Sequence, residues 1–212
     1  MKKIYYILLL IVVSCYDDDN ELIISENVSH NTSELTTMVK SMSLHNASFD
    51  NVVDNTSCFS LDFPYQLNVN SELKNISSVN DLSEVSEEDD VEIVFPININ
   101  FYNYELHEAI NQTDFNLVKN VCAEDFNITS HACLDFQYPI EIKEFNDLTE
   151  SFETFQLNND KEVYLHFDNL HDNDVYEIEY PIFLIGSNSD PLRIDSNVDF
   201  MDVFNSTLQS CN

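Results

Sequence analysis

The chain of 212 residues contains four segments in which apolar and polar residues alternate strictly. In each segment the alternation runs through an aromatic-proline pair, with apolar side chains at every second position. A period of two puts these side chains on one face of a β-strand. Each segment is therefore predicted to be a strand with one buried and one solvated face, at residues 59–69, 91–101, 134–142 and 176–184.

The proline of each segment falls on the polar side of the alternation, at Pro64, Pro96, Pro139 and Pro181. Because proline has no backbone N–H, it leaves a gap in the hydrogen-bond ladder of a sheet. We therefore expect an edge position or a local interruption of strand pairing at each proline. A second strand is expected to return after a turn, at residues 73–77, 104–110, 151–157 and 192–195.

Each returning strand is followed by Ser or Asn, then by an acid three residues later and an apolar residue after it. A side-chain oxygen at the first position caps a helix, and the acid lies in the positive first turn. The best of these helices runs from Asn197 to about Gln209, with an apolar stripe that is expected to lie in the core. The four cap-and-acid pairs are Ser78 and Asp81, Asn111 and Asp114, Asn159 and Glu162, and Ser196 and Asp199.

Four cysteines divide these repeated strand-turn-strand-helix units into two halves, each reading cysteine, unit, unit, cysteine. An even number of cysteines in an exported protein favours disulfides, and sequence alone permits three pairings. The symmetry favours Cys58–Cys122 and Cys133–Cys211, and the alternative is four buried free thiols. The predicted fold class is α+β: antiparallel sheets with short helices packed on one face, in a first half at 58–122 and a second at 133–211.

The N-terminal residues indicate export. Lys2 and Lys3 precede an apolar run at 4–13, which is too short to cross a bilayer but suits a secretory signal peptide at residues 1–14. The run ends at Cys15, whose surroundings resemble a bacterial lipobox, so Cys15 is the predicted site of lipidation. Residues 15–57 are polar and acidic, with one weakly helical stretch at 33–42, and we expect them to form a tether between the membrane and the folded halves.

The lipobox, the acidic run at 17–19 and the Cys-flanked aromatic-Pro strands together resemble surface-exposed lipoproteins of Bacteroidota, of the flavobacterial type. The similarity covers most of residues 33–211. It implies a lipid-anchored protein of the outer membrane that faces the cell exterior, and it carries no catalytic residue. The chain departs from the pattern because it has no Asp-Gly or Asn-Gly hairpin turn.

The charge of the chain is strongly negative: 39 acidic residues against 8 Lys and Arg give a net charge of −31. Such a surface repels nucleic acid and suits cations or basic partners, besides keeping the protein soluble. Hydrophobic residues make up 43% of the chain, which is enough for a folded core despite the charge.

Only one glycine is present, Gly186, and this excludes several function classes. A P-loop, a dinucleotide-binding turn and a GxSxG nucleophile elbow each need more glycines, and an EF-hand loop needs a central one. No catalytic motif is found. His166 and His171 could face one another across a turn, but we expect them to be solvated polar residues rather than metal ligands.

Two acidic loops occupy the same place in their halves, after the odd-numbered helices. Carboxylate and backbone oxygens are calcium ligands, so both loops are calcium candidates, and the alternative is that they are simply solvated. The candidate ligands are Glu87, Glu88, Asp89 and Asp90 in the first loop, and Asp168, Asp172 and Asp174 in the second.

The leading functional hypothesis is a non-enzymatic, lipid-anchored surface protein that serves adhesion, ligand capture or envelope architecture, with a protein or glycan partner and no nucleic acid. The alternative is a hydrolase that uses carboxylates on an extracellular glycan or peptide. A third hypothesis is a partner-binding module that accepts an added strand at the proline-interrupted sheet edges.

Overall fold

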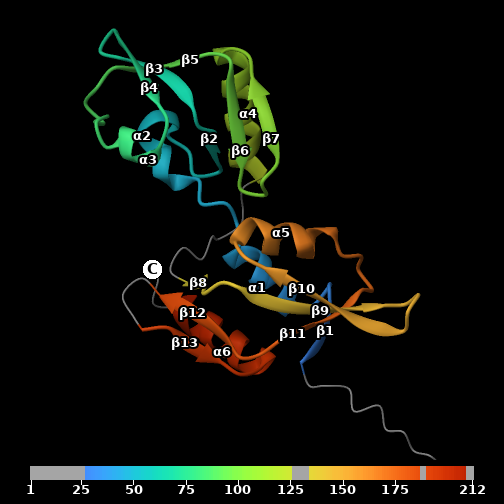
Figure 1. Ribbon diagram of the computed structural model, residues 1–212. Coiled ribbons are helices and arrows are strands. Elements are labelled where there is room, and N and C mark those ends of the chain that lie inside the picture. Colours follow the sequence, from blue (N-terminus) through green and yellow to red (C-terminus); the bar gives the residue numbers. More distant parts are fainter. Residues whose placement is uncertain (1–26, 126–133, 187–189, 209–212) are drawn as a thin grey trace, which may run out of the picture.

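A computed structural model describes residues 27–125, 134–186 and 190–208, and these form two lobes (Figure 1). The fold is mixed α+β with small antiparallel sheets, which confirms the predicted class. The first lobe contains η1 (Ser48–Asp50), α2 (Asn51–Asp54), β2 (Phe59–Leu61), β3 (Tyr65–Val69), β4 (Glu72–Ile76), α3 (Val79–Leu82), β5 (Val91–Val94), β6 (Ile97–Phe101), β7 (Leu106–Ala109) and α4 (Gln112–Asp125).

The second lobe combines the N-terminal elements with the C-terminal half of the chain. It contains β1 (Val28–His30), α1 (Glu34–Met42), β8 (Leu134–Phe136), β9 (Ile140–Asn146), β10 (Ser151–Leu157), α5 (Asp160–Asn169), β11 (Val175–Ile178), β12 (Ile182–Gly186), β13 (Leu192–Ile194) and α6 (Asn197–Leu208). The first lobe is thus inserted in the sequence of the second, between α1 and β8.

Each of the four predicted alternating strands is divided in two at its proline. The aromatic-proline bonds are cis, and they separate β2 from β3, β5 from β6, β8 from β9 and β11 from β12. The two parts lie in different sheets, so pairing is interrupted at every proline, as expected. The order strand, cis-proline, strand, strand, helix occurs four times along the chain.

Strands are exchanged between the two units of each lobe. In the first lobe β2 pairs with β6 of the next unit, while β5 of that unit pairs back with β3. The sheets are therefore β2-β6-β7 and β4-β3-β5. In the second lobe β8 pairs with β12 and β11 pairs with β9, which gives the sheets β13-β12-β8 and β1-β11-β9-β10.

The hairpin between β3 and β4 shows how a tight turn forms without the expected Asn-Gly. Asn70 and Ser71 both take left-handed backbone angles, with φ of 53° and 69°. Positive φ at both central residues is the requirement of the type I′ hairpin turn, which Asn tolerates better than most residues. The Asn70 side chain also donates to Asp89 Oδ1 at 2.6 Å and accepts from the Asp90 N–H, which fixes the turn.

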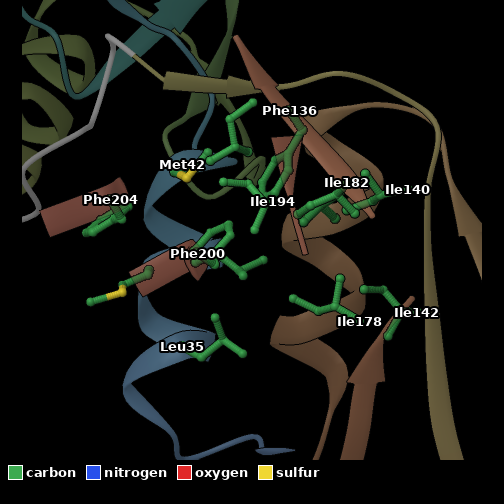
Figure 2. Close-up of a cluster of buried hydrophobic side chains, with 14 of the residues drawn as sticks. Leu35, Met42, Phe136, Ile140, Ile142, Ile178, Ile182, Ile194, Phe200 and Phe204 are labelled. Carbon is green, nitrogen blue, oxygen red and sulfur yellow. The ribbon is translucent and has the colours of Figure 1, made fainter. Parts of the chain in front are cut away.

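Residues 27–57 are not a tether, and this part of the prediction is wrong. Strand β1 pairs with β11, and α1 packs in the core of the second lobe with its apolar stripe fully buried (Figure 2). η1 and α2 pack instead on the core of the first lobe. The buried residues of the stripe are Leu35, Met38, Val39 and Met42, which face Phe136, Ile178, Ile182, Ile194 and Phe200 among others.

The physical reason is that the helical stretch at 33–42 carries an apolar face, whereas the prediction followed the polar composition of the region as a whole. Leu35, Val39 and Met42 recur at the spacing of one helix face, which needs a partner surface to leave water. Ser33 caps the helix by accepting the N–H of Thr36, and the Thr36 hydroxyl bonds to that of Tyr176 at 2.8 Å. The helix is therefore an integral part of the second lobe.

Tyr104, in the turn between β6 and β7, connects the two lobes. Its hydroxyl donates to the carbonyl of Ser43 at 3.0 Å, at the end of α1. Its ring lies 5.8 Å from the ring of Tyr164 on α5, with Lys161 Nζ 5.9 Å from the ring centroid. Tyr104 of the first lobe thus contacts the second lobe at the end of α1 and on α5.

Truncation of the α1 stripe tests its role in the core. Leu35 is 2% exposed, so Leu35→Ala is expected to lower the free energy of unfolding by about 2–5 kcal/mol through lost burial and a residual cavity. The matched control is Leu148→Ala in the β9–β10 turn, where the side chain is 96% exposed and little change is expected. Urea unfolding curves measure both. Equal stability of the two variants would contradict the packing of α1.

Candidate functional site: two equivalent hairpin–helix grooves

Four similar caps fix where each helix begins relative to the strand before it. The N–H of the residue that follows the strand donates to the acid of the cap-and-acid pair, in every unit. In three units the cap oxygen also accepts the N–H of that acid, and in the remaining one Ser78 donates to Asp81 through its N–H and its hydroxyl. The predicted caps are confirmed, and they hold each helix at a constant position beside its hairpin.

Two grooves lie between a hairpin and the helix that follows it. The first groove, about 370 Å³, lies between the β6–β7 hairpin and α4 and is lined by Phe101, Tyr102, Asn103, Glu105, His107, Asp114, Leu117, Val118, Val121 and Cys122. The second groove, about 480 Å³, lies between the β9–β10 hairpin and α5 and is lined by Glu144, Phe155, Leu157, Glu162, Leu165, His166, Asn169, Leu170, His171 and Asp174.

The two grooves occupy the same place in their units. Phe101 and Glu144 both lie five residues after the cis-proline, and six further lining positions of each groove coincide when the units are aligned on the helix caps. A groove therefore occurs at the same place of the unit in both lobes, but the side chains that line it differ. The coincident pairs are Phe101 and Glu144, His107 and Phe155, Asp114 and Glu162, Leu117 and Leu165, Val118 and His166, Val121 and Asn169, and Cys122 and Leu170.

The first groove is the more apolar of the two. Leu117 is 62% exposed and Val121 is 52% exposed, so α4 presents apolar side chains to solvent at the groove. His107 Nε2 lies 3.7 Å from Asp114 Oδ1 and gives this groove its polar end. Such exposed apolar side chains beside a concave surface are typical of a binding site rather than of a solvated face.

The second groove gathers acids and histidines around an apolar floor. Burial raises the pKa of Glu144, and the neighbouring carboxylate of Asp174 raises it further. Burial lowers the pKa of His166, whose Nε2 lies 4.0 Å from Glu144 Oε2 and has no hydrogen-bond partner among the described residues. His166 is therefore neutral at neutral pH, and the electrostatic character of the groove is that of its carboxylates.

His166 and His171 both line the second groove, as their spacing allowed, but they do not form a pair. His171 Nδ1 lies 3.3 Å from Asp174 Oδ2, and the same oxygen accepts the His171 N–H at 2.6 Å. Within the described residues no group of three or more His, Cys, Asp and Glu is placed to hold a metal ion.

Several of the calcium candidates make other contacts in the structure. Asp89 accepts the Ser86 N–H at 2.8 Å and fixes the turn before β5, which explains why its pKa is lowered. The Glu88 N–H donates a hydrogen bond to the Ser86 hydroxyl oxygen. In the second loop Asp168 pairs with Lys40 of α1 at 2.7 Å, whereas Asp174 turns to the groove. Within the part of the chain that the structure describes, Glu87, Asp90 and Asp172 belong to no group that could hold a metal ion.

One of the two predicted disulfides lies in the described part of the chain. Cys58, just before β2, is bonded to Cys122 of α4, with Cα atoms 6.1 Å apart, and both residues belong to the core of the first lobe. Cys122 also lines the first groove, so the disulfide fixes the end of that groove to β2. Cys15, Cys133 and Cys211 lie outside the described residues.

A buried acidic cluster in the first lobe had no signal in the sequence. Asp50 and Asp54 are buried, and the Leu61 N–H donates to Asp50 Oδ2 at 2.7 Å. Burial raises the pKa of Asp50 to about 6, and burial together with the nearby Asp50 charge raises that of Asp54 to about 8. Asp50 Oδ1, Asp54 Oδ2 and the Tyr65 hydroxyl have no hydrogen-bond partner among the described residues.

Comparison with protein-family models, with curated proteins and with solved structures finds no match for the chain. A separate finding concerns the membrane: among the described residues, no helix has the length and apolar composition that a bilayer span requires.

The buried pair predicts a specific dependence of stability on pH. Because both pKa values are raised above the unfolded value near 4, the native state binds more protons, and the free energy of unfolding falls as pH rises from about 4 to 8. Asp54→Asn should flatten this decline by at least about 1.4 kcal/mol, the equivalent of one pKa unit. Glu72→Gln on the exposed surface of β4 is the control. Parallel profiles for wild type and Asp54→Asn, measured by urea unfolding, would contradict the burial of this charge.

Proposed function

We propose that the protein is a lipid-anchored surface protein of the bacterial outer membrane that binds an extracellular polypeptide through its hairpin–helix grooves. The sequence features that support the anchor are the signal peptide at 1–14 and Cys15. The observation that carries the binding function is the occurrence of one groove at equivalent positions in both lobes, each with apolar side chains exposed beside carboxylates.

The chemistry of the grooves favours a polypeptide over a glycan. The most exposed apolar side chains of the first groove, Leu117 and Val121, are aliphatic and suit apolar side chains of a polypeptide, and the chain contains no Trp for stacking on a sugar. The acids of both grooves and the net charge of −31 favour a partner that carries positive charge next to apolar side chains.

Cys15→Ser tests the anchor. The variant should lose incorporation of radiolabelled palmitate and move from the detergent phase to the aqueous phase on phase separation, because the thiol that carries the lipid is gone. Protease treatment of intact cells measures exposure of the wild-type protein to the exterior. Retention of the label in Cys15→Ser would refute the anchor.

A dye titration tests the grooves. The uncharged apolar dye Nile red should bind saturably to the full chain, and Leu117→Glu should remove about half of the bound dye because it places a charge in the first groove. Leu148→Glu, at an exposed position outside both grooves, is the control and should leave binding unchanged. Equal binding by all three proteins would contradict a binding role for the grooves.

One observation favours the second candidate, a hydrolase that uses carboxylates. Glu144 combines a raised pKa with a position in a concave site beside Glu162 and Asp174, which is the environment of a general acid. If the protein is a hydrolase, turnover of chromogenic glycosides or peptides should be lost in Glu144→Gln and retained in Glu92→Gln on β5. Turnover that survives in Glu144→Gln would eliminate this site as catalytic.

A further inference from the structure

β10 is the most exposed strand edge of the described structure. It is the outer strand of the sheet β1-β11-β9-β10, and its seven residues make it the longest of the outer strands. Six of the seven residues are exposed. Figure 1 shows the β9–β10 hairpin extending beyond the body of the second lobe, with β10 next to α5.

β10 has few of the features that normally prevent an edge strand from pairing. Outer strands of natural proteins carry Lys, Pro or bulges, or are very short. The sequence of β10 is Ser-Phe-Glu-Thr-Phe-Gln-Leu, whose only charge is that of Glu153. β10 pairs with β9 in regular register over its whole length, and Phe152 and Phe155 leave apolar surface exposed on its two faces.

The face of β10 that points to α5 continues the second groove. Phe155 lies opposite Ile142 and its ring is 5.1 Å from that of His166, while Glu153 lies opposite Glu144. Glu153 and Phe155 are two residues apart and so share this face. The groove beyond them is lined by further acids and, among the described residues, by no Lys or Arg.

We propose that β10 binds an extended basic polypeptide by adding it as a fifth strand to the sheet. This inference rests on the proposed function and specifies its mode for the second groove. Backbone hydrogen bonds along β10 supply affinity, and the α5 face selects the sequence. On that face a basic side chain of the bound peptide lies over Glu153. The peptide side chain two residues along packs against Phe155 and the apolar residues that line the groove.

A second copy of the chain is a poorer occupant of this edge. Two copies would each bring a net charge of −31, and their acidic hairpins would approach closely. Like charges at an interface oppose association, whereas a cationic strand is attracted by the same field. The charge of the edge therefore favours a basic partner over self-association.

The test uses a nine-residue peptide in which Thr alternates with Lys and Ile, so that Lys and Ile follow one another on a single face. Isothermal titration with the full chain should give saturable binding. A strand added at an edge uses the N–H groups of alternate residues only, because the other N–H groups point away from the sheet. Two methylated peptides are therefore compared, one N-methylated at the Thr amides and the other at the Lys and Ile amides. One of the two peptides should lose binding and the other should keep it.

Protein variants locate the site. Glu153→Lys should weaken peptide binding at least about tenfold, because it removes the attractive charge and places a gatekeeping Lys on the edge. Glu72→Lys on β4, another exposed outer strand, is the matched control and should bind normally. Urea unfolding of Glu153→Lys verifies that the lobe remains folded. Phe155→Thr, which introduces a β-branched residue that suits a strand but removes the aromatic ring, offers a second variant with the same expected loss.

Several outcomes would overturn the inference. Binding that survives both methylation patterns would exclude strand addition, and equal loss in Glu72→Lys and Glu153→Lys would indicate attraction by net charge alone. Concentration-dependent dimers that dissociate in Glu153→Lys would make a second copy the occupant. No peptide binding, together with dye binding that responds to Leu117→Glu, would refute strand addition at β10 while leaving the proposed function intact.

Discussion

The exchange of strands between neighbouring units is the interaction on which each lobe depends. β2 finds its partner in β6 and β5 finds its partner in β3, so each three-stranded sheet of the first lobe contains strands of both units. The same exchange joins β8 to β12 and β11 to β9. Because a two-stranded hairpin alone is marginal in water, neither unit can complete its sheets without the other. The lobe, and not the repeat, is therefore the smallest stable body.

This dependence also explains the grooves. The hairpin of each unit is held in a sheet by the strand from the neighbouring unit, and the helix is held by its cap. The space between hairpin and helix is therefore set by two independent constraints. In the first lobe the Cys58–Cys122 disulfide adds a third, since it joins α4 to the segment before β2. A groove with such fixed walls can present exposed apolar side chains without collapsing onto them.

Local patterns made the strands, the returning strands and the helix caps predictable from sequence. Alternation at residues 59–69 and the Asn159–Glu162 spacing act within a few residues, and the structure follows them closely. The pairing partners could not be read in the same way, because an alternating segment has the same period in any sheet. The division at each proline was expected as an interruption, but the transfer to another sheet depends on the second unit of the lobe.

Other features were predicted wrongly or not at all because the same sequence pattern is compatible with two structures. The stripe of α1 was present at Leu35, Val39 and Met42, yet its polar neighbours resemble a tether. Acidic loops supply calcium ligands and turn anchors from the same residues, and Asp89 is a turn anchor. The grooves had a usable signal, since alignment of the units on their caps superposes Leu117 on Leu165, whereas nothing near Asp50 and Asp54 indicates that both are buried.

The position of β1 has a mechanical consequence. β1 follows directly on the N-terminal segment and forms one border of the sheet β1-β11-β9-β10, while β10 forms the opposite border. For a chain held at its N-terminal end and loaded by a ligand on β10, the tension crosses this one sheet from border to border. The first lobe, inserted between α1 and β8, stands aside from that line of force. The first lobe could therefore change conformation, or even unfold, while the four strands of this sheet still connect the N-terminal end to the ligand on β10.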